Sequence, residues 1–140
     1  MCFRESATKR TFNPNVPSPR TTAAQLLSEL VAEYSGTARY KFELSETYRA
    51  FEPNLIPSGE TDRYIEQLLI ARSLVEELVL EQTHVATYRV HLAHVYAHLG
   101  MQLGERNDYK RAEEFTRKSI ESHTMVVRDY PGLAEMSRTL

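Results

Sequence analysis

Cysteine, tryptophan and long apolar runs are the features that this sequence has least of. Cys2 is the only cysteine, so no intramolecular disulfide and no thiolate metal cluster can form. No run of about 18 apolar residues is present, which excludes a membrane-spanning helix. The N-terminus has no apolar segment of the kind that directs secretion. We therefore expect a soluble, cytoplasmic protein that has no membrane partner.

A strong net charge is also missing. The 17 basic and 19 acidic residues leave a net charge of −2, which gives no reason to expect a nucleic acid partner. A length of 140 residues suits one domain. Residues 1–19 carry three prolines among Asn, Ser and Thr and are predicted to form a disordered arm, so that residues 20–140 make up the domain.

Helical periodicity dominates the remainder of the chain. Apolar residues recur at helical spacing in segments at about 21–34, 38–50, 63–81, 84–103 and 109–130, and residues 133–140 begin a sixth. Thr21 or Thr22 is expected to cap the first helix, Gly36 to follow it in the left-handed conformation, and Asp108 to cap the fifth helix. Leu55 and Ile56 are expected to pack onto the core. The short connections predict an all-α fold of antiparallel helical hairpins.

The chain repeats itself with an offset of 48 residues. Tyr48 falls on Tyr96 in this register, as do Glu33 on Glu81 and Asp129. Further sets of coinciding positions are Ala23, Ala71 and Ser119; Leu30, Leu78 and Val126; Tyr40, Tyr88 and Met136; and Leu44, Leu92 and Leu140. So many coincidences without a gap predict an α-solenoid built from this unit.

The second copy resembles the tetratricopeptide repeat. Leu99-Gly100 stands where that motif has Leu-Gly on its first helix, and Ala112 follows Gly100 at the spacing of the small residue on the second helix. Tyr96 occupies the aromatic position. The resemblance implies that Gly100 and Ala112 let two antiparallel helices approach closely.

The first copy departs from the motif, because Glu52 and Tyr64 stand at its two small-residue positions. The period of 48 also exceeds the usual value of about 34. The phrase at 126–131 and its counterpart at 78–83 are similar to the tetratricopeptide-like repeats that trail bacterial, notably planctomycete, serine/threonine kinases. The resemblance covers about residues 21–140, and no kinase motif occurs in the chain, so kinase activity is not implied.

A row of histidines is the sharpest chemical feature. His84, His91, His94 and His98 fall within a wedge of about 80 degrees on one helix, which predicts that they flank the core without entering it. His94 and His98 have the spacing at which two imidazoles can chelate a divalent metal ion. A complete zinc site would need further ligands that the sequence does not place.

The repeat register brings carboxylates opposite this row. Glu43 and Glu46 align with His91 and His94, so the carboxylates are expected to face the imidazoles across neighbouring first helices. Such pairing raises the pKa of histidine or supports weak metal binding. In repeat arrays the first helices line the concave surface, where ligands dock. Glu43, Glu46, His91, His94 and His98 are therefore the candidate partner-binding residues; no catalytic, cofactor or metal residue is assigned.

Two functions follow from these patterns. The first is a non-enzymatic scaffold for protein–protein interaction, in which a peptide or helix docks in the concave groove. Tyr40, Tyr48, Tyr88 and Tyr96 are expected to pack in the core with their hydroxyls at its rim. The second is a metal- or pH-responsive sensor that uses the histidine row. The last helix stops at Leu140 without its repeat partner, which predicts self-association or continuation in a longer chain.

Overall fold

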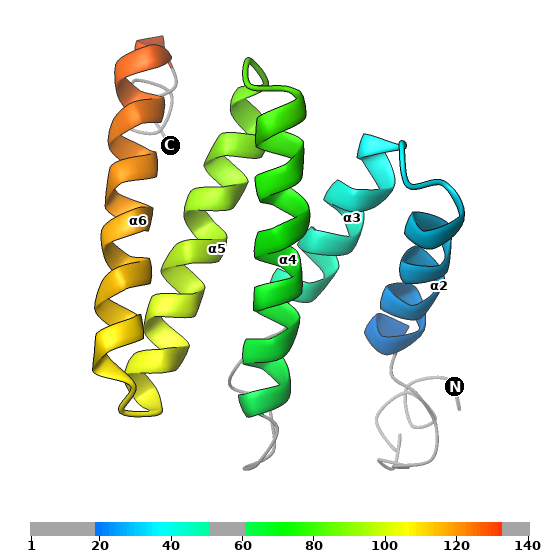
Figure 1. Ribbon diagram of the computed structural model, residues 1–140, viewed down its shortest axis with the longest axis horizontal. Helices are drawn as coiled ribbons and strands as arrows, with labels where there is room; N and C mark the ends of the chain where they lie inside the picture. The colour runs from blue at the N-terminus through cyan, green and yellow to red at the C-terminus, as the bar shows by residue number, and fades with distance from the viewer. Residues whose placement is uncertain (1–18, 51–60, 133–140) are drawn as a thin grey trace, which may run out of the picture.

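The computed structural model describes residues 19–50 and 61–132, which form five α-helices and no strand. The predicted all-α class is confirmed for this part of the chain. The helices follow one another across the molecule in chain order, from α2 at one end to α6 at the other (Figure 1). Their bounds are α2 Pro19–Glu33, α3 Ala38–Arg49, α4 Thr61–Glu81, α5 Ala86–Glu105 and α6 Tyr109–Asp129.

The predicted helix bounds are close to those observed. α3 and α6 match to within one residue, whereas α5 begins and ends two residues later than predicted. α2 begins at Pro19, ahead of the predicted cap at Thr21 or Thr22, since proline is compatible with the first turn of a helix. The predicted arm at 1–19, apart from Pro19, lies outside the described residues. So do Leu55, Ile56 and the helix expected at 133–140.

α5 and α6 approach each other closely at Gly100. Gly100 is buried, and a Cβ atom added there would meet the side chain of Thr116 and lie 3.3 Å from the carbonyl oxygen of Ala112. Next to this contact the Ser119 hydroxyl donates to the Ala93 carbonyl at 2.9 Å. The predicted backbone-to-backbone contact at Gly100 and Ala112 is therefore confirmed.

The pair α3 and α4 is joined by larger side chains. Tyr64, at the position equivalent to Ala112, is 1% exposed, and its hydroxyl donates to the Arg49 carbonyl at 3.1 Å. The buried Lys41 lies 3.4 Å from Glu77 and 3.6 Å from Glu81 on α4. The α3–α4 pair is therefore joined by an aromatic ring and an ion-pair cluster, whereas the α5–α6 pair is joined by direct contact at small residues.

The turns show which local predictions were right. Asp108 caps α6 by accepting from the Arg111 amide at 3.3 Å, as expected. Asn107 has a φ of 62°, and the amides of Asn107 and Asp108 donate back to the carbonyls of Gly104 and Leu103, which closes α5 with a Schellman motif. The expectation for Gly36 is wrong, because its φ is not in the left-handed region. The 34–37 turn is closed without it, by the Thr37 amide on the Tyr34 carbonyl.

Equivalent backbone features recur 48 residues apart. α2, α4 and α6 end at Glu33, Glu81 and Asp129, and α3 and α5 begin at Ala38 and Ala86. The residue before α3 has φ −89° and ψ 102°, and the residue before α5 has φ −85° and ψ 101°. Turn hydrogen bonds occupy the same register: Tyr34 to Leu30, Gln82 to Leu78 and Tyr130 to Val126, amide to carbonyl.

The core lies where α4, α5 and α6 meet. Its fully buried residues include Leu68, Ala71 and Val75 of α4 and Val95 and Leu99 of α5. Tyr96 and Phe115 stack beside them with ring centroids 6.1 Å apart. None of the helices described here combines the length and apolarity needed to cross a membrane.

Candidate functional site

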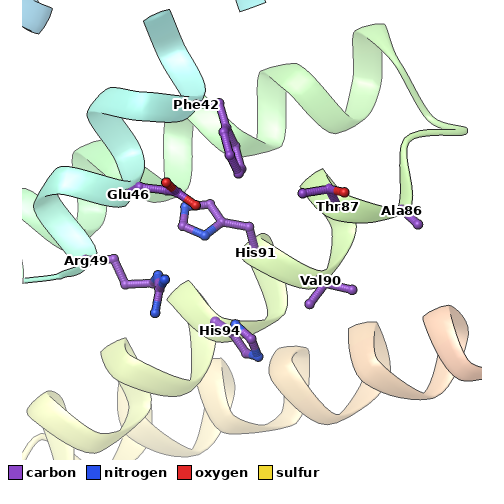
Figure 2. A pocket seen from close by; sticks show the side chains of 8 residues that line it. All are labelled: Phe42, Glu46, Arg49, Ala86, Thr87, Val90, His91 and His94. Atoms are coloured by element: carbon purple, nitrogen blue, oxygen red, sulfur yellow. The ribbon is translucent and has the colours of Figure 1, made fainter. Parts of the chain in front are cut away.

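A cavity of about 320 Å³ lies between α3 and α5. Its lining divides by chemistry into an apolar part and a polar part (Figure 2). Phe42 from α3 and Ala86, Thr87 and Val90 from the first turns of α5 form the first part. The second part consists of Glu46 and Arg49 from α3 with His91 and His94 from α5. We refer to these eight residues as the α3–α5 groove.

His91 is buried in the wall of this groove. It is 4% exposed, and its Nε2 lies 2.9 Å from the Ser45 hydroxyl oxygen. The Ser45 hydroxyl donates its own proton to the Phe42 carbonyl at 2.7 Å. The serine oxygen can therefore only accept from His91, which fixes the proton on Nε2 and leaves Nδ1 as an acceptor. The prediction that all four histidines flank the core is wrong for His91, which enters it.

The carboxylates do not act on the histidines as expected. Burial, together with the positive charge of Arg49, lowers the pKa of His91 to about 4, whereas carboxylate pairing would raise it. Glu43 pairs with Arg39 on its own helix at 3.0 Å instead. The predicted opposition of Glu43 and His91 is therefore wrong, since serine, two residues further along α3, contacts the imidazole.

The other histidines have separate environments. His94 is exposed on the groove, its ring centroid is 5.4 Å from that of His123 on α6, and its pKa is lowered by partial burial, by His123 and by Arg49. The Nδ1 of His98 donates to the His94 carbonyl at 2.8 Å. His84 lies in the turn before α5, where its carbonyl accepts from the Tyr130 hydroxyl at 2.8 Å.

The structure brings three of the five candidate residues into one site. Glu46, His91 and His94 line the groove, but Glu43 and His98 do not. Sequence reasoning missed Phe42, Ser45 and Arg49. Arg49 lies one helical turn after Glu46 on the same predicted helix, so the turn-to-turn spacing carried a signal for it. No comparable signal was available for Ser45, because its partner lies 46 residues away.

The arrangement of ligating side chains bears on the metal hypothesis. Within the described ranges, no three or more His, Cys, Asp and Glu side chains are grouped so as to hold a metal ion. His94 has a histidine neighbour on α6, His123, with ring centroids 5.4 Å apart, and this contact involves only two imidazoles. In the pair that was expected to chelate, the Nδ1 of His98 donates to the carbonyl of His94, so Nε2 is the nitrogen of His98 that is left as an acceptor.

Two of the four tyrosines predicted to pack in the core, Tyr48 and Tyr96, have hydroxyls with side-chain partners. Tyr96 is 8% exposed, and its hydroxyl donates to Glu76 at 2.7 Å. Its counterpart Tyr48 places its hydroxyl 3.4 Å from Ser28. Both pairs are separated by 20 residues, and each member of one is 48 residues from its equivalent in the other.

Comparison of this chain with protein-family models, with curated proteins and with solved structures found no match. The groove must therefore be interpreted from its own geometry.

Proposed function

We propose that this chain is a tetratricopeptide-like repeat array that serves as a non-enzymatic scaffold for protein–protein interaction. Two recurring features support the repeat with a period of 48. The C-terminal ends of α2, α4 and α6 and the first residues of α3 and α5 coincide at that offset, and so do the Ser28–Tyr48 and Glu76–Tyr96 hydrogen bonds. In such an array α3 and α5 are the first helices of successive units, and the surface between first helices is where ligands dock.

The α3–α5 groove is the observation that carries the functional proposal. It places the Phe42 ring and the Val90 side chain beside a cation, Arg49, and a neutral imidazole, His91. Apolar contact area with a few polar groups that fix orientation is the composition of a peptide-binding site. A cavity of about 320 Å³ accommodates one or two side chains of a docked segment, with the rest of the segment lying along the helices.

A peptide selection tests this function. A phage-displayed peptide library is selected on the full chain, and each recovered peptide is titrated against a Thr87→Arg variant. Thr87 is exposed at the groove, so arginine there obstructs docking without disturbing the core. Thr124→Arg, at an exposed position on α6, is the matched control. We expect at least about a tenfold loss of affinity in the first variant and none in the second.

Two outcomes contradict the scaffold proposal. One is a selection that yields no peptide with measurable affinity, and the other is a set of peptides that bind the Thr87→Arg variant as well as the parent.

The second candidate function, a pH-responsive sensor, has one supporting observation, the buried neutral His91 at the α3–α5 junction. Its consequence is that the free energy of unfolding depends on pH.

A further inference from the structure

Arg49 is the one arginine of the groove, and its side chain has no ion-pair partner within residues 19–50 and 61–132. Its Nε is buried and has no hydrogen-bond acceptor among the described residues. The guanidinium forms none of the ion pairs found in that part of the chain. Arg39, on the same helix, pairs with Glu43 at 3.0 Å. A guanidinium without an ion-pair partner can bind a ligand carboxylate without first breaking another ion pair.

The groups around Arg49 favour an anion of single charge. Glu46 is the carboxylate of the groove, and it makes no ion pair with Arg49. His91 and His94 feel the positive field of Arg49, since that charge contributes to lowering the pKa of each imidazole. A carboxylate matches the planar fork of one guanidinium. A phosphate would bring a second negative charge close to Glu46, which makes it the poorer match.

The apolar part of the groove determines which side chain of the ligand lies beside the carboxylate. Phe42 and Val90 line it together with the methyl group of Ala86, and they meet the polar part within one cavity (Figure 2). We propose that the groove binds a peptide segment in which an Asp or Glu side chain adjoins an aliphatic residue. The carboxylate pairs with Arg49, and the aliphatic side chain contacts Phe42 and Val90. This inference rests on the scaffold function and names the chemistry of its partner.

Binding of this kind is linked to a proton on His94. The charged and titratable groups facing His94 are Arg49 and Glu46 on α3, His123 on α6, and His91 and His98 on its own helix. A bound carboxylate offsets the field of Arg49, so the pKa of His94 is higher in the complex than in the free protein. The complex therefore holds more protons, and its affinity increases as the pH falls through the range in which His94 takes up its proton.

Two blocked dipeptides test the carboxylate. The ¹⁵N-labelled full chain is titrated by NMR with Ac-Glu-Leu-NH₂ and with Ac-Gln-Leu-NH₂, which differ only in charge. We expect the first to shift the Arg49 Nε–H and His94 ring resonances and the second to bind at least about tenfold more weakly. An Arg49→Gln variant should lose this preference, whereas Arg39→Gln, on the same helix, should keep it. Equal affinity for the two dipeptides, or a preference that survives Arg49→Gln, overturns the inference.

Further measurements distinguish a side-chain carboxylate from a chain terminus, and distinguish failure of this inference from failure of the scaffold function. Ac-Leu with a free carboxylate tests a chain terminus, and tighter binding than Ac-Glu-Leu-NH₂ overturns the choice of a side chain. Affinity for Ac-Glu-Leu-NH₂ that does not increase from about pH 7.5 to about pH 5.5 overturns the proton linkage. Peptides selected on the groove but lacking an acidic residue overturn the inference and leave the scaffold function standing. Failure of the selection itself overturns both.

Discussion

At the scale of single residues, Ser45 has a role that its type does not suggest. It is fully buried and joins α3 to α5 by accepting from His91 while donating within its own helix. A serine in a helix is ordinarily a weak helix former that bonds to the preceding turn. Here that local bond uses the only proton of the hydroxyl, so the oxygen can only accept from His91. A bond within α3 thus determines the tautomer of a histidine on α5.

Ser45→Ala should destabilise the protein by about 1–3 kcal/mol, because it leaves the buried Nε2–H of His91 without an acceptor. Urea denaturation measures the change. Ser73→Ala is the matched control, since Ser73 is exposed and its hydroxyl bonds to a carbonyl of its own helix. A loss in the control as large as that in Ser45→Ala would contradict this role of the serine.

At the scale of elements, the residue at one position of the repeat determines which atoms meet between paired helices. Ala112 and Gly100 allow α6 onto the backbone of α5, whereas Tyr64 at the equivalent of Ala112 fills the space between α4 and α3. The resemblance to the tetratricopeptide repeat predicted this close contact, because Gly100 and Ala112 match its two small-residue positions. Two glycines on α5 provide a matched comparison.

Gly100→Ala should destabilise the folded protein, whereas Gly104→Ala should stabilise it. Both gain helix propensity, worth up to about 1 kcal/mol. At Gly100 the new methyl group lies 3.3 Å from the Ala112 carbonyl oxygen and the Thr116 amide and also meets the Thr116 side chain, so a net loss of about 1–2 kcal/mol is expected. At Gly104 the nearest atom is the Ala112 Cβ at 3.9 Å, an ordinary contact. Thermal unfolding of the two variants should show shifts of opposite sign.

Helix positions and part of the groove were accessible from the sequence, for identifiable reasons. The apolar period gave five helices, and Asp108 marked the start of α6 through the usual cap chemistry. Glu46, His91 and His94 were found because they stand at one face of two equivalent helices. The burial of His91 was missed because it depends on the rotation and separation of α3 and α5. A repeat register aligns residues along the chain but does not specify which atoms meet.

At the scale of the whole molecule, the buried neutral His91 couples stability to pH. Its pKa is about 4 in the folded protein and about 6.5 when unfolded, so the unfolded state binds more protons between these values. Stability contributed by this group is present above about pH 6.5 and is lost as the pH falls towards 4. Each pKa unit of difference between the folded and unfolded states corresponds to about 1.4 kcal/mol, so the contribution of His91 to the free energy of unfolding has an upper limit of the order of 3 kcal/mol.

His91→Gln should flatten the dependence of stability on pH in the window from about 6.5 to 4, because glutamine does not titrate there. The free energy of unfolding in urea is measured across this window for the parent and the variant. His84→Gln, in the exposed turn before α5, should retain the slope of the parent. A variant whose slope equals that of the parent would assign the effect to other groups.

Burial also differs from one end of the molecule to the other. Between residues 22 and 33 no side chain of α2 is fully buried, and α2 packs chiefly on α3. The fully enclosed side chains lie mostly on α4 and α5. From this difference in burial we expect α2 to detach at a smaller energetic cost than the separation of α5 from α6 requires. The groove lies between α3 and α5, so one of its walls is the helix on which α2 packs. A ligand bound in the groove, as proposed, would contact both α3 and α5, and is therefore expected to stabilise the packing of α3 on the rest of the domain.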